Sequence, residues 1–115
     1  MIYILMICYD PTKPADADNQ NLQPEHAALE QEMRADGTYV GGAGLFPVEM
    51  AIMVRKTGDA ATVTDGPFAE TKESVGGFFV VDCETKEHAI DYAKRIPVDN
   101  RSWVDARPVA LWHPK

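Results

Sequence analysis

Two uninterrupted apolar runs constrain the fold of this chain more than any other feature. The first is Ile2–Tyr9, and the second is Gly77–Val81, which ends at Asp82. A short apolar run without polar alternation is typical of a strand that is covered on both faces. The two runs therefore predict a sheet with other layers packed against it.

A first helix is predicted to begin at Pro24, after a polar loop over residues 10–23. Proline suits the first turn because its missing N–H would have no partner there, and Glu25 favours the positive end of the helix. The helix should run to about Ala35, with Leu29 and Met33 facing inward. Gly37 supplies the left-handed conformation that ends it.

A second helix is predicted after the second apolar run. Thr85 or Glu84 opens it and Pro97 stops it. Its apolar residues recur at helical spacing and fall on one stripe: Ala89, Ile90, Ala93 and Ile96.

Three further segments read as strands or turns. Residues 38–40 form a short strand, and Gly41–Gly44 reads as a bend that allows close backbone approach. Residues 50–56 and 60–64 flank a turn at 57–59, which indicates a hairpin. Residues 102–109 alternate apolar with charged side chains, and Pro108 places this last strand near an edge.

Without the hairpin, the order of elements is βαββαβ, the ferredoxin-like arrangement, in a single α+β domain spanning residues 1–115. Both helices then cover one face of an antiparallel sheet. The other face is apolar, with Phe78 or Phe79 pointing into it. Since such a face is not stable in water, we expect a homodimer.

Composition excludes several classes of partner. Eleven Lys and Arg against eighteen Asp and Glu give a net charge of −7, so no nucleic acid is expected. The apolar N-terminus is too short to span a membrane and has no basic lead or cleavage site, so no membrane association and a cytoplasmic location are expected.

Cys8 and Cys83 read as reduced, buried thiols, although a disulfide between paired strands is geometrically conceivable. No histidines have metal-ligand spacing, so neither a metal nor a cofactor is expected.

The connection Asp65–Glu73 carries the most functional information. It uses about ten residues where a plain antiparallel connection needs two to five. It combines a carboxylate at a strand end, a Gly-Pro pair, Phe68 and a Glu/Lys/Glu cluster. One interpretation is a rigid turn in which Asp65 caps its own backbone amides. The other is a binding or catalytic site.

This segment, Asp65-Gly66-Pro67-Phe68-Ala69-Glu70-Thr71-Lys72-Glu73, closely resembles the signature of the YCII-related family, in its DGPF branch. Gly76–Phe79, Tyr9-Asp10 and Val104–Val109 are similar to that branch as well. The resemblance implies a dimeric ferredoxin-like α+β barrel. Most DGPF members have no assigned reaction, and many are encoded beside extracytoplasmic-function sigma factors.

In the wider family a His–Asp pair is proposed to be catalytic, and one member resembles a dehydrochlorinase of chlorinated hydroxyquinols. The family histidine lies in a Pro-x-His-Leu helix start, and Pro24-Glu25-His26-Ala27 matches its proline and histidine but has Ala27 for the leucine. DGPF members often lack this histidine. The resemblance therefore nominates His26 as a general base with Asp65 as its partner, and Asp10 as second choice.

For His26, an ordinary surface histidine is the alternative interpretation. Candidate substrate-binding residues cluster around the same turn and the end of the first strand: Phe68, Tyr9, Asp10, Glu70 and Lys72. For the aromatic candidates, core packing explains the pattern equally well.

Two functions remain open from the sequence. The first is cofactor-free acid–base chemistry, of lyase or hydrolase type, on a small organic molecule. The second is a non-catalytic dimeric module that binds a small ligand or a regulatory partner such as a sigma factor. Cofactor-free oxygenation, a third, rests on fold analogy alone.

Overall fold

The structure, a computed structural model, describes residues 1–15 and 22–115. Four antiparallel strands form one sheet in the order β2-β5-β1-β6, and a two-stranded hairpin, β3–β4, stands apart from it. This is the α+β, ferredoxin-like arrangement expected from the sequence. The elements are β1 (Ile2–Tyr9), α1 (Gln23–Ala35), β2 (Tyr39–Gly44), the 3-10 turn η2 (Val48–Met50), β3 (Ile52–Thr57), β4 (Ala60–Asp65), β5 (Ser74–Asp82), α2 (Lys86–Arg95) and β6 (Ser102–Pro108).

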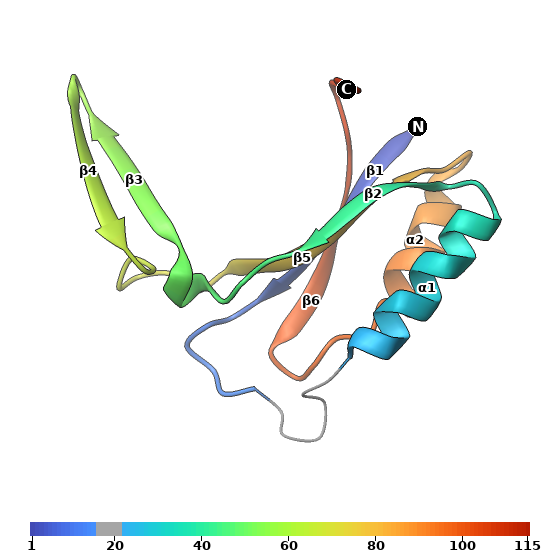
Figure 1. Cartoon of the computed structure of the whole chain (residues 1–115), viewed down its shortest axis with the longest axis horizontal. Helices are drawn as coiled ribbons and strands as arrows, with labels where there is room; N and C mark the ends of the chain where they lie inside the picture. Colours follow the sequence, from blue (N-terminus) through green and yellow to red (C-terminus); the bar gives the residue numbers. More distant parts are fainter. Residues whose placement is uncertain (16–21) are drawn as a thin grey trace.

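Both helices cover the same face of the sheet (Figure 1). The core lies between these two layers, and its side chains come from alternate positions of β1 and β5 and from one stripe of each helix. Leu5, Val81 and Met33 are fully buried. The prediction that Leu29 and Met33 face inward is confirmed.

The helix ends follow from local sequence. Thr85 caps α2 by accepting a hydrogen bond from the backbone N–H of His88 at 3.1 Å. Gly37, at φ 80°, ends the turn after α1. On α2, Ala89 and Ile96 are buried as expected, whereas Ile90 is only half-buried. Tyr92, which the predicted stripe left out, fills the core instead.

The prediction of a bend at Gly41–Gly44 is wrong, because these residues form most of strand β2 and pair with β5. The expectation of close backbone approach is right. A Cβ added at Gly42 would lie 2.8 Å from the carbonyl oxygen of Phe78, and one added at Gly77 would lie 2.8 Å from that of Ala43. Two strands that approach this closely can pair only where glycine leaves room for the neighbouring carbonyl oxygen. This pairing outweighs the low strand propensity of glycine.

The other face of the sheet carries no helix (Figure 1). We call it the open sheet face. Strand alternation places on it the even-numbered residues of β1, with Phe78, Val80 and Trp103 from the neighbouring strands. Asp105 and Arg107 form an ion pair on the same face. It is therefore a largely apolar surface with one charged edge.

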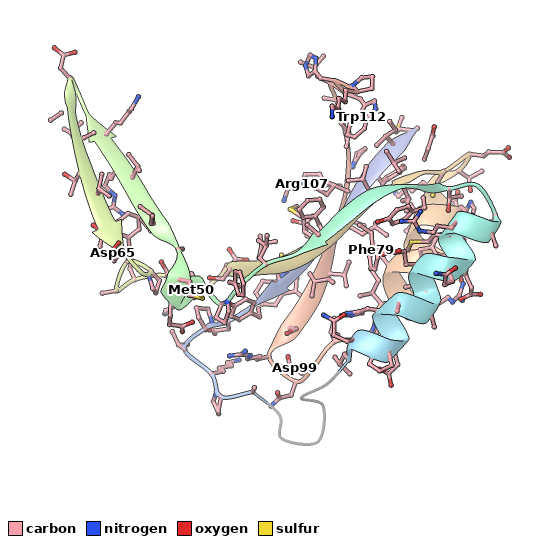
Figure 2. All side chains as sticks on the ribbon, in the orientation of Figure 1. Met50, Asp65, Phe79, Asp99, Arg107 and Trp112 are labelled. Carbon is pink, nitrogen blue, oxygen red and sulfur yellow. The ribbon has the colours of Figure 1, made fainter. Side chains whose placement is uncertain are left out.

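The β3–β4 hairpin extends away from the rest of the molecule (Figure 1). We call it the arm. The radius of gyration is 15.9 Å, whereas a compact domain of this length is expected to have about 13 Å. The arm, with Met50 at its base and Asp65 along it in Figure 2, explains why the molecule is extended.

Both cysteines are free thiols, as expected, with Cys83 buried and Cys8 half-buried. Within the described ranges, no helix has the length and apolar character needed to cross a membrane.

Candidate functional site

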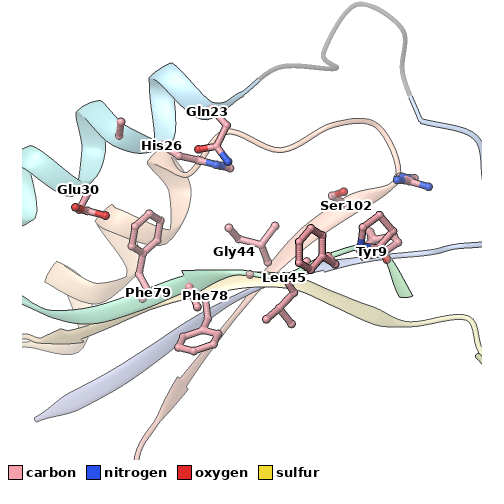
Figure 3. A pocket seen from close by; sticks show the side chains of 18 residues that line it. Tyr9, Gln23, His26, Glu30, Gly44, Leu45, Phe78, Phe79 and Ser102 are labelled. Carbon is pink, nitrogen blue, oxygen red and sulfur yellow. The ribbon is translucent and has the colours of Figure 1, made fainter. Parts of the chain in front are cut away.

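A cavity of about 740 Å³ lies between the first half of α1 and the adjacent ends of β1, β2 and β5 (Figure 3). Gln23, His26 and Glu30 line it from the helix. Its size falls within the range of about 300–1,000 Å³ typical of small-molecule sites.

The cavity exists because the strands beneath it lack side chains. Gly42, Gly44 and Gly77 all fall on the helix-facing side, since Gly42 pairs with Phe79 and Gly44 pairs with Gly77. Further along the same face, Phe79 and Val81 fill the space under the helices. Where the glycines replace such side chains, the space between α1 and the sheet stays hollow.

His26 has a defined hydrogen bond at the edge of this cavity. Its Nε2 lies 2.9 Å from the carbonyl oxygen of Pro97, and its ring packs edge-on against Phe79 with centroids 6.3 Å apart. A carbonyl oxygen can only accept, so Nε2–H donates to Pro97. In the neutral form of the ring this hydrogen bond leaves the lone pair on Nδ1, which is the nitrogen that can then act as a base. His26 is part-buried, and this hydrogen bond orients its ring.

The carboxylate that shares the cavity with His26 is Glu30, one helical turn further along α1. Its Oε2 accepts from Nε of Arg34 at 3.0 Å, and its side chain is 34% exposed. Asp65 does not line this cavity. It lies on the arm, whereas Phe79, against which His26 packs, lies beneath α1 (Figure 2). Within one protomer His26 and Asp65 belong to different parts of the molecule, and their pairing stays a prediction.

At the far end of the cavity, Tyr9 and Arg101 stack, with the guanidinium carbon 4.7 Å from the ring centroid. The Tyr9 hydroxyl accepts from the backbone N–H of Val48 at 3.1 Å, and Nη1 of Arg101 donates to the carbonyl of Lys13 at 3.1 Å. Nε of Arg101 is buried and has no hydrogen-bond partner among the described residues, although Asp99 Oδ2 lies 3.5 Å away. This end of the cavity is therefore lined by the guanidinium of Arg101 and the ring of Tyr9.

The Asp65–Glu73 segment braces the arm. Asp65 ends β4, and Gly66, at φ 82°, donates its N–H to the carbonyl of Ala51 at 2.7 Å. The guanidinium carbon of Arg55 lies 3.8 Å from the centroid of the Phe68 ring. Oε1 of Glu70 accepts a hydrogen bond from Nη2 of Arg55 at 3.0 Å. Of the predicted substrate-binding residues, Phe68 and Glu70 thus contact Arg55 of the arm, and Tyr9 lines the cavity.

Asp10 and Lys72 do not line the cavity. Hydrogen bonds from the Thr12 hydroxyl and backbone N–H lower the pKa of Asp10 below its usual value. Asp10 thus stabilises the turn that follows β1. Lys72 is exposed.

In the part of the chain that the structure describes, no group of three or more His, Cys, Asp or Glu residues is arranged to hold a metal ion.

Sequence reasoning missed Glu30, Arg101 and Ser102. It also missed the three glycines beneath the cavity, Gly42, Gly44 and Gly77, which we call the glycine floor. A usable signal was present for the glycines. Gly42 and Gly44 have the two-residue spacing of one strand face, and Gly76-Gly77 begins the neighbouring apolar strand. Arg101 comes from the loop before β6, and no local pattern places it beside Tyr9.

Comparison with known proteins supplies the family. The chain matches the YCII-related domain over residues 1–113. It belongs to the YCII-related family. It is also 30% identical over 120 residues to the uncharacterised protein R00369 of Rhizobium meliloti strain 1021, across 99% of this chain and 96% of that protein. This YCII-related protein is therefore similar to an uncharacterised relative over nearly its whole length.

Proposed function

We propose that this YCII-related protein binds a small organic molecule in the cavity beneath α1 and acts on it by cofactor-free acid–base chemistry, with His26 as the base. The hydrogen bond from Nε2 of His26 to the carbonyl of Pro97 carries the proposal. It sets the tautomer and orients the ring, which is what a general base requires.

The composition of the cavity supports a ligand with an apolar body and polar groups at its ends. Phe79 and Leu45 supply apolar surface, the glycine floor allows a flat group to lie close to the backbone, and Arg101 lines the cavity beside Tyr9. Removal of an acidic C–H proton, or activation of water for hydrolysis, is the chemistry that such a base can perform.

A non-catalytic ligand-binding or regulatory module is the second candidate. One observation favours it: the partner of His26 is a backbone carbonyl rather than a carboxylate, so nothing described stabilises a charged imidazolium directly. The two candidates predict the same binding and differ in turnover.

We also propose that the protein is a homodimer of the DGPF branch. The apolar residues of the open sheet face, among them Phe78 and Trp103, support association, and the segment Asp65–Phe68 supports the branch.

Proton exchange in D₂O tests the proposed chemistry without knowledge of the product. Ligand-detected NMR first selects binders from a pool of small aromatic and carboxylic acids. Incubation in D₂O with wild-type protein should then erase the signal of an acidic C–H proton in a bound molecule. His26→Ala should abolish this loss, whereas His88→Ala, on α2, should retain it. Exchange that persists in His26→Ala would refute the base, and binding without exchange would favour the module.

The location of binding has its own control. A Cβ added at Gly44 meets nothing within 4 Å, so Gly44→Leu should fold and fill the cavity from its floor. Binders that Gly44→Leu still holds with wild-type affinity would place the ligand elsewhere.

A further inference from the structure

The two charged side chains that line the cavity differ in how well they are paired. Glu30 and Arg101 are the only Asp, Glu, Lys or Arg residues among the described residues that line it. The carboxylate of Glu30 accepts from Nε of Arg34 at 3.0 Å. Nε of Arg101 lies 3.5 Å from Oδ2 of Asp99, which is longer than the separation of about 2.7–2.9 Å in a charge-assisted hydrogen bond. The cation of the cavity is therefore less completely paired than its carboxylate.

One edge of the Arg101 guanidinium makes no hydrogen bond to the described part of the chain. Nη1 donates to the carbonyl of Lys13 at 3.1 Å. Nε is buried without a hydrogen-bond partner among the described residues, and these residues provide none for Nη2. Nε–H and one N–H of Nη2 lie side by side, on the edge that binds both oxygens of a carboxylate. Because buried donors are normally paired, this edge needs an acceptor from another source, such as a ligand.

The neighbours of Arg101 hold its side chain in position. The guanidinium carbon lies 4.7 Å from the centroid of the Tyr9 ring. Oδ1 of Asp99 accepts hydrogen bonds from the Ser102 hydroxyl and from the backbone N–H of Arg101, so Asp99 is itself fixed. Together with the bond from Nη1 to Lys13, these contacts order the guanidinium before a ligand arrives. Less conformational entropy is then lost on binding.

The two charges lie at different ends of the cavity. Figure 3 shows Glu30 and Tyr9 at opposite ends, with His26 between them. Arg101 packs on Tyr9. An anionic group bound at Arg101 is therefore kept away from the Glu30 carboxylate, and the rest of such a ligand extends over the glycine floor toward His26.

We propose that the cavity binds a planar organic carboxylate whose carboxylate group is held by Arg101. This inference rests on the proposed ligand cavity and adds the charge of the ligand to it. Nη2 makes the first contact. Nε is shielded from water, so the guanidinium must shift slightly from Asp99 for Nε to reach the second oxygen. A doubly charged anion is disfavoured, because the cavity has one cation in a protein of net charge −7.

Pairs of an acid and its primary amide test the charge, because the two molecules have nearly the same shape. The probes are 2-naphthoate with 2-naphthamide, and phenylpyruvate with phenylpyruvamide. Titration of the full-length protein followed by ligand-detected NMR should give each acid a dissociation constant at least about 10-fold lower than that of its amide. The Nε–H resonance of Arg101, assigned by its absence from Arg101→Gln, should shift with the acids and not with the amides.

Two variants should change the affinity in opposite directions. Arg101→Gln should weaken binding of the acids at least about 10-fold and leave the amides unchanged, and Arg101→Lys, which keeps the charge but not the paired donors, should restore part of it. Asp99→Asn retains an acceptor for Ser102 and removes a competing negative charge, so it should tighten acid binding by about two- to fivefold. Lys94→Gln removes one positive charge from the exposed surface of α2 and should match wild type.

The outcomes separate this inference from the proposed chemistry. Equal affinity for acids and amides, or acid binding that Arg101→Gln leaves intact, overturns the carboxylate site. If phenylpyruvamide then still loses its acidic C–H proton in D₂O through His26, the proposed function stands without it. Acid binding that depends on Arg101 without proton exchange supports the site and removes the base. Acid binding that Asp99→Asn weakens as much as Arg101→Gln does would assign both effects to damage in the loop and overturn the inference.

Urea unfolding of each variant checks that the loop change leaves the protein folded. If Arg101→Gln does not fold, the comparison of acid with amide on the wild-type protein still decides the question, because that comparison needs no variant. Failure of both acids and both amides to bind would overturn this inference together with the proposed cavity.

Discussion

The close backbone approach between β2 and β5 gives a sharp test of the structure. Gly42→Ala adds a methyl group 2.8 Å from the carbonyl oxygen of Phe78, a separation that real Cβ atoms do not adopt. The obstructing atom belongs to a paired strand, so the sheet itself must shift. Overpacking of this kind costs about 1–3 kcal/mol. Gly44→Ala is the matched control in the same strand, because its added methyl meets nothing within 4 Å.

The two variants should change the stability of the protein in opposite directions relative to wild type. Where the backbone conformation is compatible, replacing glycine with alanine stabilises by about 0.4–1 kcal/mol, because the unfolded chain loses freedom. Gly44 does not have a positive φ, so Gly44→Ala should match or exceed wild type. The expected gap between the two variants is therefore roughly 1.5–4 kcal/mol.

Urea unfolding followed by circular dichroism measures this gap. With a slope of about 1–3 kcal/mol per M, the midpoint of Gly42→Ala should fall about 1 M or more below that of Gly44→Ala. All samples must have one protein concentration, since association would otherwise change the apparent stability. Equal midpoints for the two variants would refute the close approach.

Gly77→Ala approaches the same strand pair from the other side, with its added methyl 2.8 Å from the carbonyl oxygen of Ala43. It should destabilise by a similar amount. Once one substitution has separated the strands, the second meets less resistance. The double variant should therefore cost less than the sum of the single ones, and strict additivity would count against a shared cause.

Three further predictions concern other parts of the chain. Burial opposes ionisation of Asp36, but hydrogen bonds from Thr38 and Tyr92 outweigh it and lower the pKa of Asp36; its contribution to stability is present above the unfolded-state pKa and lost as pH falls through the folded value, so Asp36→Asn should flatten the loss of stability measured by urea unfolding between pH 5 and pH 2. Gly66→Ala should destabilise the protein by about 1 kcal/mol or more in the same assay, because a positive φ is strained for alanine, whereas the control Gly41→Ala, which has no positive φ and whose added methyl meets nothing within 4 Å, should not. Burial, followed by the nearby charges of Asp105 and Glu73, raises the pKa of Cys8, so at pH 7 the native protein should react with a thiol reagent far more slowly than the unfolded chain, and equal rates would contradict this.

Much of the fold could be predicted because its signals are local. The run Ile2–Tyr9 forms the first strand with the predicted bounds. Pro24 lies in the first turn of α1, and Gly37 lies just after the end of the helix. Strand β2 could not be predicted in full, because Gly41–Gly44 has no intrinsic strand preference. Its conformation comes from pairing with β5, which is remote in sequence.

The site was predictable only in part, for a similar reason. A histidine in the first turn of a helix is a local feature, and His26 does line the cavity. Its distance from Asp65 depends instead on the direction in which the arm leaves the sheet. That direction is set by two contacts of the segment that follows β4. Gly66 donates to the carbonyl of Ala51, just before β3, and Phe68 packs against Arg55 of β3. The segment that resembles the family signature therefore also contacts the arm and holds it in place in the protomer.

The glycine floor has a consequence for how binding preference can change within such a family. Most pockets are enlarged by truncating a packed side chain, which leaves a destabilising void. This cavity is instead bounded by glycines, which have no side chain to truncate, and a Cβ added at Gly44 would meet nothing within 4 Å. Alanine, serine or valine at this position would narrow the cavity in graded steps without removing any core contact. Selectivity can thus diverge among relatives by single substitutions with little loss of stability.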